Sequence, residues 1–393
     1  MTNRRSKPIH ILFDASPLLV NKTGVAYYTE QLVTELAKHY PDQLELTGFY
    51  YNFLGRRRTA FPKAPNLHWH GVHLLPSKVV YQLRRWGIEM PVELLAGRRG
   101  DFVLFPNFLS YPSLHKTPSA PVIHDLTYLE MPQYVSPKNG SDLRRFTPKA
   151  IRRASFVITV SEVAKHAISK QYAVPLKNIL VTPIPVSERH ELPQKKCLSL
   201  LEANNLTKPF ILFVGTIDPR KNIIGLINGY CALPKELRSR YSLVLVGRIE
   251  RFAAAEAAKI EEAKAAGFDV IHLGYVAEEV KQALYQSATM FAHAALHEGF
   301  GMPVLEAMSH GLPCVISDIP VFREVAGDAA LYFDYQEPAS VAKALASILE
   351  DPKTAQRLST ASKKRAASFT WQRVAADVYQ QICAHLAQES PGD

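Results

Sequence analysis

The chain has 393 residues, 47% of them hydrophobic and 21% charged, which is the balance of an ordinary globular protein. This length exceeds what one hydrophobic core usually serves and predicts two domains. Four cysteines are scattered without CxxC spacing, which argues against a disulfide framework or a zinc site and favours a reducing compartment. We find no signal-peptide core and no run of roughly 18 apolar residues, so we expect a cytoplasmic protein, soluble or peripheral at the membrane face.

The net charge of +10 is concentrated in the first half of the chain. Residues 1–190 carry 25 Lys and Arg against 13 Asp and Glu, whereas residues 191–393 carry 21 against 23. A basic first half favours an anionic partner such as a membrane surface, an acidic acceptor or nucleic acid. An ordinary solvated basic face accounts for the same charges equally well.

In chain order, the first half alternates short apolar runs with helical patterns. A strand is expected over residues 9–14, followed by a glycine-containing loop and a helix over 25–38. Further short buried strands are expected at 102–105, 121–123 and 156–160.

The second half repeats this alternation. Strands are expected at 210–214, 242–246, 270–273, 290–294 and 313–316, with helices that include 252–266 and 278–287. Apolar strands that alternate with helices predict parallel sheets with helices on both faces, and hence an α/β fold of two Rossmann-like domains. We expect an N-terminal domain over 1–187, a C-terminal domain over 205–371, and a last helix over about 372–390 that packs back on the first domain.

The first motif with chemical content follows the strand at 210–214 and reads GTIDPRKN. Asp218 is a good helix N-cap and is followed by proline, which places Arg220 and Lys221 in the first helical turn. Cations there oppose the helix macrodipole, unless a phosphate-bearing ligand lies between them and the helix amides. Two exposed basic residues beside an N-cap remain the alternative.

The second motif, HEGFGMPVLEA, follows the strand at 290–294. Gly299 and Gly301 permit a tight loop and close approach of a ligand, and free amides around Phe300 are able to hold a pyrophosphate. Glu298 lies in the loop and Glu306 is expected on the first turn of the following helix. The two carboxylates are suited to sugar hydroxyls or to a hydrolytic acid/base pair. An acidic residue near a helix start is also electrostatically favourable without any function.

Two weaker signals lie in the first half. Gly24 follows the first strand, where the helix amides after it are able to approach a phosphate. His124 stands at the carboxyl end of a strand, where open parallel sheets bind ligands. A simple turn and a structural histidine are the ordinary alternatives for these two positions. The sequence contains no GxxxxGK[ST], no GxGxxG and no Asp-x-Asp, which argues against ATP hydrolysis, NAD binding and a metal-bound diphosphate.

Taken together, these motifs resemble family 4 of the retaining, GT-B-fold glycosyltransferases. The resemblance covers nearly the whole chain and is most specific in the E-x7-E spacing within EGFGMPVLEA. It is supported by GTIDPRKN and SDIPVFREVAGDAALYFD, and in the first half by VIHDLTYLEMPQY and VITVSEVAKHAI. The resemblance implies two Rossmann-like domains that face each other across a cleft, and sugar transfer from a nucleoside diphosphate sugar.

The resemblance also implies roles for single residues. In the diphosphate site, Arg220 and Lys221 would bind the donor diphosphate together with backbone at Gly215, Thr216 and, from the other domain, Gly24. At the sugar and ribose, Glu298 would contact the transferred sugar, Glu306 would hold the ribose, and His124 would lie over the donor sugar. Many relatives carry Arg where this chain has Thr216, so binding of the diphosphate would depend more on Arg220 and Lys221.

The expected reaction is transfer of a hexosyl residue with retention of anomeric configuration, without metal or other cofactor. The resemblance favours GDP-mannose over UDP- and dTDP-sugars, and the acceptor would be a glycan or a lipid-linked glycan in polysaccharide biosynthesis. Residues 76–100, with Arg84, Arg85, Arg98 and Arg99, and the cluster 56–58 are candidates for docking on an anionic membrane. The alternatives are a GT-B-fold nucleotide-sugar epimerase and a non-enzymatic, basic polymer-binding protein. Nucleic acid is not expected, because it would not explain the E-x7-E motif of the neutral half.

Overall fold

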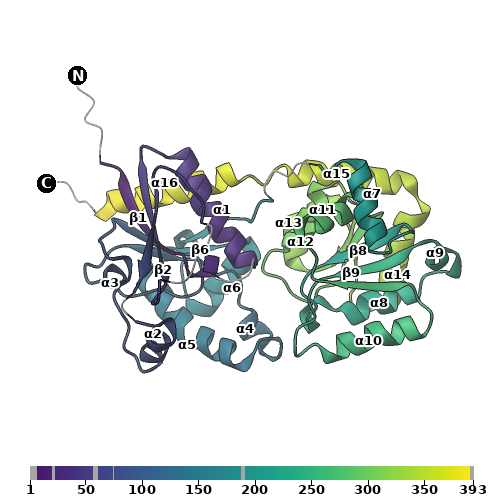
Figure 1. Ribbon diagram of the computed structural model, residues 1–393, viewed down its shortest axis with the longest axis horizontal. Coiled ribbons are helices and arrows are strands. Elements are labelled where there is room, and N and C mark those ends of the chain that lie inside the picture. Colours follow the sequence, from purple (N-terminus) through teal and green to yellow (C-terminus); the bar gives the residue numbers. More distant parts are fainter. Residues whose placement is uncertain (1–6, 20–22, 56–60, 74, 187–190, 390–393) are drawn as a thin grey trace, which may run out of the picture. The chain divides into compact units, whose positions relative to one another are not determined.

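The structure is a computed structural model that describes residues 7–19, 23–55, 61–73, 75–186 and 191–389. The chain divides into two compact units (Figure 1). The N-terminal unit comprises Met1–Ile184 and Thr370–Asp393, and the C-terminal unit comprises Pro185–Phe369. Within the described residues, none of the helices has both the length and the apolar character needed to cross a membrane.

The N-terminal unit is built on a parallel sheet in the order β3-β2-β1-β4-β5. Its strands are β1 (Ile9–Asp14), β2 (Leu44–Tyr51), β3 (Leu67–Val72), β4 (Phe102–Phe105) and β5 (Ser119–Pro121). A bridge between Val122 and Ile158 connects this sheet to the parallel pair β6 (Val157–Thr159) and β7 (Ile179–Val181). β2 and β3 were not predicted from the sequence, and β5 ends two residues earlier than expected.

Helices and short 3-10 turns surround this sheet. They are η1 (Ser16–Leu19), α1 (Gly24–His39), α2 (Ser77–Arg85), α3 (Val92–Ala96), α4 (Thr127–Glu130), η2 (Pro132–Tyr134), α5 (Pro137–Arg153), α6 (Glu162–Tyr172), η3 (Leu176–Asn178) and the final helix α16 (Trp371–Glu389). α16 packs on α1, where Tyr40 and Tyr379 stack with ring centroids 3.9 Å apart. The ring centroids of Trp371 and Tyr28 are 5.9 Å apart. The last helix therefore belongs to the N-terminal unit.

The C-terminal unit has a six-stranded parallel sheet in the order β10-β9-β8-β11-β12-β13. Its strands are β8 (Phe210–Val214), β9 (Ser242–Val246), β10 (Val270–Gly274), β11 (Met290–His293), β12 (Cys314–Ser317) and β13 (Ala330–Phe333). Its helices and turns are α7 (Gln194–Ala203), η4 (Pro219–Lys221), α8 (Ile223–Cys231), α9 (Lys235–Arg240), α10 (Ala254–Ala265), α11 (Glu278–Ser287), α12 (Met302–Ser309), α13 (Pro320–Ala326), η5 (Gly327–Ala329), α14 (Pro338–Glu350) and α15 (Pro352–Ala366).

Both faces of this sheet are covered, which explains its uninterrupted apolar strands. Along β8, Ile211 and Phe213 join one core cluster with residues of α8, α10 and α14. Phe210 and Leu212 join the opposite cluster with residues of α11, α12 and α13. The predicted α/β fold with parallel sheets is therefore confirmed. The segment between 187 and 205, left between the predicted domains, contributes α7 to the C-terminal unit, where this helix packs on α11.

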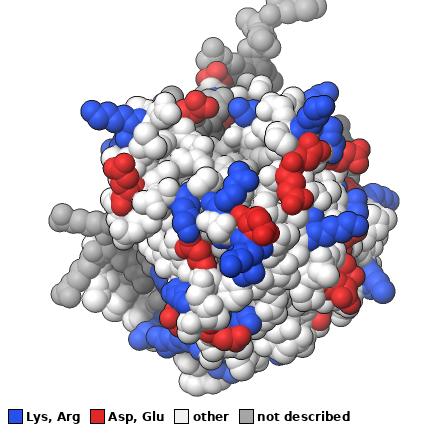
Figure 2. Space-filling view, turned by 90° about the vertical axis from the view of Figure 1, so that its right-hand side faces the viewer, with Lys and Arg blue, Asp and Glu red and all other residues white. Residues whose placement is uncertain are grey.

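Figure 2 shows one face of the molecule, turned toward the viewer from the side of Figure 1 on which α9 is labelled. Lys and Arg side chains are interspersed there with Asp and Glu side chains rather than gathered by sign (Figure 2). Exposed ion pairs of α10, such as Lys259 with Glu262 at 2.8 Å, show the same mixing. This pattern agrees with the near-neutral charge of the second half of the sequence.

Candidate active site

The strand order of the C-terminal unit reverses between β8 and β11, and open parallel sheets bind ligands beyond the carboxyl ends of strands at such a point. The loop after β8 leads into η4, and the loop after β11 leads into α12. The two loops are joined where the amide of Leu296 donates to the carbonyl of Arg220 at 2.7 Å. The two sequence motifs of the second half thus meet at one place.

A glycine of a third loop supports this arrangement. Gly247, directly after β9, has φ +144°, and a Cβ atom there would lie 1.9 Å from the carbonyl oxygen of Gly215. The backbones of the β8 and β9 loops approach this closely only because position 247 lacks a side chain. The sequence analysis did not single out Gly247, although a glycine directly after a predicted central strand was the signal available.

Arg220 and Lys221 lie in η4, and not in the first turn of the following α-helix as the sequence analysis expected. Asp218 caps this short turn, with Oδ1 accepting from the amide of Arg220 at 2.9 Å. Asn222 then adopts a left-handed conformation with φ +50° and caps α8, which begins only at Ile223. Because that residue separates the turn from the helix, the predicted conflict with the helix macrodipole does not arise.

Asp218 also fixes the side chain of Arg220. Nη2 of Arg220 donates to Oδ2 of Asp218 at 2.9 Å, and Asp218 itself is 3% exposed. A guanidinium held by a buried carboxylate points in a defined direction.

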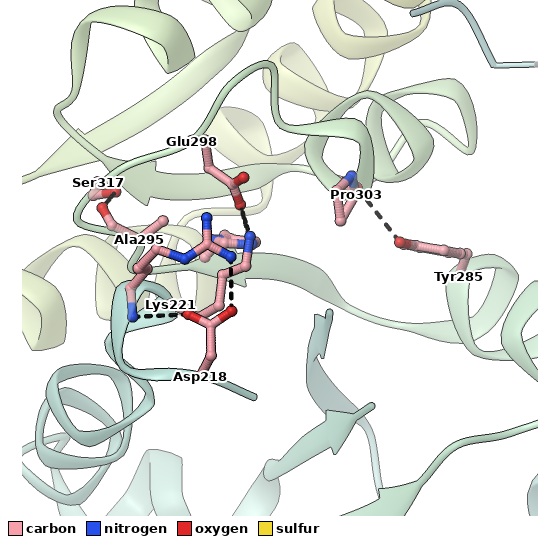
Figure 3. A network of polar contacts seen from close by, with 9 residues as sticks. Asp218, Lys221, Tyr285, Ala295, Glu298, Pro303 and Ser317 are labelled. Atoms are coloured by element: carbon pink, nitrogen blue, oxygen red, sulfur yellow. Dashed lines mark hydrogen bonds and ion pairs between the residues drawn. The ribbon is translucent and has the colours of Figure 1, made fainter. Parts of the chain in front are cut away.

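Lys221 and Glu298 form a buried ion pair. Each side chain is only 10% exposed, and Nζ of Lys221 donates to Oε1 of Glu298 (Figure 3). Burial raises the pKa of the Glu298 carboxyl, but the positive charges of Lys221 and Arg220 outweigh this effect and hold the pKa below its ordinary value. Glu298 is therefore a carboxylate at neutral pH although it is buried.

A histidine that the sequence analysis did not consider adjoins this pair. His293, the last residue of β11, is fully buried, and its Nε2 lies 3.6 Å from Oε1 of Glu298. Burial is the main cause that lowers the pKa of His293 to about 3, so its ring is neutral at physiological pH. A lone histidine at the end of an apolar strand carries no sequence signal that distinguishes it from a core residue.

The glycine-rich loop leads into α12. Gly301 has φ +95° and occupies the N-cap position, and a Cβ atom there would lie 2.7 Å from the ring of Phe322. α12 then runs from Met302 with proline in its first turn and ends before Gly311, as expected. Glu306 is the fifth residue of α12 and thus lies in its second turn rather than its first.

Glu306 has partners separate from those of Glu298. The hydroxyl of Tyr285 donates to Oε2 of Glu306 at 3.0 Å, and Nζ of Lys281 lies 3.4 Å from Oε1. Both partners come from α11, which packs beside the sheet. The E-x7-E spacing therefore places two carboxylates in one unit, each with its own cation.

In the N-terminal unit, the equivalent reversal of strand order lies between β1 and β4. Gly24 is the first residue of α1, whose N-cap Thr23 accepts from the amide of Ala26 at 3.2 Å. Gly24 thus lies at a helix N-terminus after the first strand. Residues 20–22, which precede this helix start, and the predicted basic cluster 56–58 lie outside the described residues.

His124 is 8% exposed and held by its surroundings. Its Nε2 donates to the carbonyl of Pro106 at 2.9 Å. Its ring packs edge-on against that of Tyr28, with the ring centroids 5.4 Å apart. Burial lowers the pKa of His124, against smaller opposing effects of this bond and of Asp125. The ring is therefore a neutral imidazole that carries its proton on Nε2.

A cavity of about 590 Å³ lies beside this reversal, lined within the N-terminal unit by β1, α2, α5 and the loop after β4. Asp14 and Arg84 line it together with the rings of Tyr111 and Phe146. Arg84 was predicted to face a membrane, and this is wrong for that residue. Its side chain is buried, donates to the carbonyl of Ser110 at 2.7 Å, and lies 5.0 Å and 4.6 Å from the centroids of those two rings.

The structure thus brings together Arg220, Lys221 and Glu298 in one network, with Gly215 and Thr216 in the adjoining loop. Gly299 and Phe300 lie in the same loop as Glu298, and Phe300 is buried against Phe369. Gly24 and His124 belong to the other unit. Among the described residues, no group of three or more His, Cys, Asp or Glu side chains is arranged to hold a metal ion.

Residues 201–365 match the family described as glycosyl transferases group 1. The match lies within the C-terminal unit, Pro185–Phe369, and covers most of it. Over 379 residues, the chain is 28% identical to O-antigen chain mannosyltransferase B of Escherichia coli, covering 92% of this chain and 96% of that protein. The chain is thus a glycosyltransferase related to O-antigen mannosyltransferases.

Solved structures share the fold of the whole chain. Sucrose-phosphate synthase from Thermosynechococcus elongatus superposes with a TM-score of 0.71 at 17% identity, covering 96% of this chain and 99% of that one. The Anabaena protein HepE in complex with UDP-glucose gives a TM-score of 0.65 at 17% identity, covering 97% and 100%. These neighbours are GT-B proteins, so the predicted GT-B fold class is confirmed.

Proposed function

We propose that this glycosyltransferase transfers a mannosyl residue from a nucleoside diphosphate sugar, GDP-mannose in the first place, to a hydroxyl of a growing polysaccharide. Similarity over nearly the whole length to an O-antigen mannosyltransferase supports the sugar and the acceptor class. The ligand in the HepE structure, UDP-glucose, supports a nucleoside diphosphate sugar as the donor class.

The buried Lys221–Glu298 pair beside Arg220 carries this proposal. Transfer of a sugar leaves negative charge on the departing diphosphate, while positive charge grows on the sugar ring. Arg220 and Lys221 stabilise the first charge, and the carboxylate of Glu298 orients the sugar through its hydroxyls. The contact of Lys221 with Glu298 and that of Arg220 with Asp218 hold these three groups close together before the donor binds.

Further groups of the C-terminal unit hold the rest of the donor. Glu306, oriented by Tyr285 and Lys281, accepts hydrogen bonds from the ribose hydroxyls. Backbone amides of Gly215, Thr216 and the loop of Gly299 and Gly301 complete the diphosphate site. From the N-terminal unit, the amides that follow Gly24 contribute an anion site at the start of α1.

We assign retention of configuration and independence from metal to the same reaction. We assign to His124, neutral and held by Pro106, the role of a hydrogen-bond acceptor through Nδ1 rather than that of a charged acid. The acceptor attacks on the face that the diphosphate leaves, and a phosphate oxygen takes its proton. The cations Arg220 and Lys221 supply the charge that a metal would otherwise provide. Unchanged turnover in excess EDTA is the expected result, and loss that added Mg²⁺ restores would contradict it.

Calorimetric titration tests the donor site directly. GDP, UDP, dTDP and ADP are titrated into the protein and into Lys221→Ala. We expect micromolar affinity for GDP and a loss of about tenfold, or roughly 1.4 kcal/mol, in the variant. Failure of all four nucleotides to bind the unaltered protein would overturn the proposal. Incubation of GDP-mannose without acceptor separates a transferase, which leaves the donor or slowly hydrolyses it, from an epimerase, which releases an isomeric sugar.

The acceptor sugar occupies the cavity of the N-terminal unit. Aromatic rings such as Tyr111 and Phe146 pack against the apolar faces of a sugar, while Asp14 and Asn107 reach its hydroxyls. Asp14 is buried and accepts from the amide of Ser16 at 2.9 Å, and burial raises the pKa of its carboxyl. The chemistry of the lining thus fits an uncharged carbohydrate better than a charged one.

A membrane surface is the proposed partner of the segment around α2 and α3. Trp86, Ile88 and Leu94 are 75%, 57% and 51% exposed, and the exposed Arg98 and Arg99 follow α3. Exposed rings and aliphatic chains beside cations suit an anionic bilayer that carries a lipid-linked acceptor. Flotation with phosphatidylglycerol vesicles, but not with phosphatidylcholine vesicles, is expected. Arg98→Glu with Arg99→Glu should abolish it, whereas Lys259→Glu with Lys264→Glu in the other unit should not.

A further inference from the structure

His293 is a costly residue for its position. It is fully buried, and its ring centroid lies 5.0, 5.9 and 5.4 Å from those of Phe213, Phe291 and Phe322. Among the described residues, neither of its ring nitrogens has a hydrogen-bond partner. A buried polar group without a partner costs about 1–3 kcal/mol. If packing alone mattered, a phenylalanine would suit this aromatic site better.

The charged groups around His293 determine which of its ring nitrogens carries the proton. Within the described part of the chain, the charged groups that act on it are Glu298, from the loop before α12, and Lys221, from η4. The rings of Phe213, Phe291 and Phe322 also pack around it. Nε2 lies 3.6 Å from Oε1 of Glu298, slightly beyond a hydrogen bond. A carboxylate on that side favours the tautomer with the proton on Nε2, which makes His293 a neutral donor aimed at Glu298.

The diphosphate of the donor must compete with Glu298 for Lys221. In the structure, Lys221 donates to Glu298. A diphosphate carries more negative charge than one carboxylate and therefore draws the ammonium group toward itself. Glu298, only 10% exposed, would then keep a buried charge with its cation shared or lost, and such a charge is strongly unfavourable.

We propose that His293 is a positioning residue that donates its Nε2–H to Glu298 when the diphosphate of the donor takes up Lys221. A small movement of the carboxylate closes the 3.6 Å distance to a hydrogen bond. His293 thereby keeps Glu298 ionised and aimed at the hydroxyls of the sugar. The inference rests on the proposed function, because it presumes a nucleoside diphosphate sugar at this site.

The proposal predicts an effect on the sugar and not on the nucleotide. A nucleoside diphosphate engages Arg220 and Lys221 whether or not Glu298 is well placed. The sugar gains affinity from Glu298 when this carboxylate is correctly oriented. His293→Phe keeps an aromatic ring in the site and removes the donor, His293→Gln brings an amide N–H near the position of Nε2, and His293→Asn carries the same amide one methylene shorter.

The test is calorimetric titration of GDP and of GDP-mannose into the full chain and the three variants, with UDP and UDP-glucose as a second pair. His293→Phe should bind GDP within about twofold of the unaltered protein and lose about tenfold in affinity for GDP-mannose. His293→Gln should regain most of this loss, and His293→Asn should not. In turnover, the acidic limb of the kcat profile should move to higher pH in His293→Phe, because kcat reports ionisation in the donor complex.

The outcomes separate the inference from the function on which it rests. Thermal unfolding controls for folding, and His293→Phe should be at least as stable as the unaltered protein. Equal affinity of His293→Phe for GDP-mannose would overturn the positioning role while leaving the donor site intact. Equal losses for GDP and GDP-mannose, or failure of His293→Gln to restore the sugar contribution, would overturn it as well. If the unaltered protein binds neither nucleotide nor sugar nucleotide, the donor site itself is wrong and both proposals fall.

Discussion

At the reversal between β8 and β11 of the C-terminal unit, the side chains that meet are charged: Lys221 and Glu298 pair in a buried contact, with Arg220 beside them. At the reversal between β1 and β4 of the N-terminal unit, the side chains instead enclose a cavity of about 590 Å³ that has rings as well as polar groups in its lining. Both sheets offer the same kind of crevice. Its chemistry is suited to an anion in one unit and to a carbohydrate in the other.

We expect the largest effect from removing one partner of the buried ion pair in the C-terminal unit. Lys221→Met leaves Glu298 as a buried charge without its cation, which costs about 3–5 kcal/mol of stability, and it should lower kcat/KM by about 10²–10³-fold. The double variant Lys221→Met with Glu298→Leu should recover much of the stability and none of the activity. Chemical denaturation and initial rates measure both quantities.

A matched surface pair controls this experiment. Lys208 and Asp269 lie 2.9 Å apart with side chains 48% and 31% exposed. Because exposed pairs contribute about 0–1 kcal/mol, Lys208→Met should change little. If Lys221→Met were no more destabilising than Lys208→Met, the pair of the active site would not be held as a buried contact.

The backbone beneath the charged site gives the second prediction. Gly247→Ala places a Cβ 1.9 Å from the carbonyl oxygen of Gly215, so the β8 loop must shift. We expect a loss of about 2–4 kcal/mol of stability and weaker nucleotide binding. Gly267→Ala is the control: φ is +80° there but a Cβ meets nothing within 4 Å, so only the backbone cost of about 1 kcal/mol remains. Equal effects of the two changes would show that the close approach at Gly247 is unimportant.

The third prediction concerns Arg84 in the cavity of the N-terminal unit. Arg84→Met removes a guanidinium that lines the cavity and lies against Tyr111 and Phe146. KM for the acceptor should rise about tenfold, while the affinity for GDP stays within about twofold. Arg85→Met, at the adjacent exposed position, should leave both unchanged. A loss of GDP affinity in Arg84→Met would mean that the two crevices do not divide donor and acceptor as proposed.

How much of this could be predicted from the sequence differs between the two units. Lys221 and Glu298 lie 77 positions apart, and their motifs were sufficient to place both at strand ends, because parallel strands end at one edge of a sheet. Arg84 was misplaced because helical periodicity shows which residues share a face but not which face is buried. The spacing of Val80 and Arg84, one turn apart, placed both on one face of the helix, and the structure shows that this face is buried.

Other features had no local signal. β2 contains Gly48 and Thr47 in its centre, which weakens its apolar run, and it is stabilised by its neighbours β1 and β3 on both sides. The division of η4 from α8 depends on Asn222 in a left-handed conformation, which a sequence ending in RKN does not specify. His293 differs from a core residue only through the position of Glu298, which is a property of the folded loop.

The last prediction uses the pH dependence of stability, which can be followed in each unit separately. The pKa of His293 falls from 6.5 in an unfolded chain to about 3 in the folded one. Between these values the unfolded state binds the proton and the folded state does not, so the free energy of unfolding rises with pH and the gain is complete above about 6.5. This group contributes at most about 1.4 kcal/mol per pH unit in that window.

Lowering the pH from 7 to 5 should therefore destabilise the C-terminal unit, and His293→Phe should reduce this loss, because a phenyl ring binds no proton. The three tryptophans, at positions 69, 86 and 371, all belong to the N-terminal unit, so their fluorescence follows that unit alone. Amide exchange of β8 and β11 peptides, corrected for the intrinsic rate at each pH, follows the other. His124 is intact in both proteins, so the fluorescence transition should shift equally with pH in the unaltered chain and in His293→Phe. If His293→Phe instead changed the fluorescence transition and left the exchange of β11 unaltered, the buried histidine would not be the source of the pH dependence in the C-terminal unit.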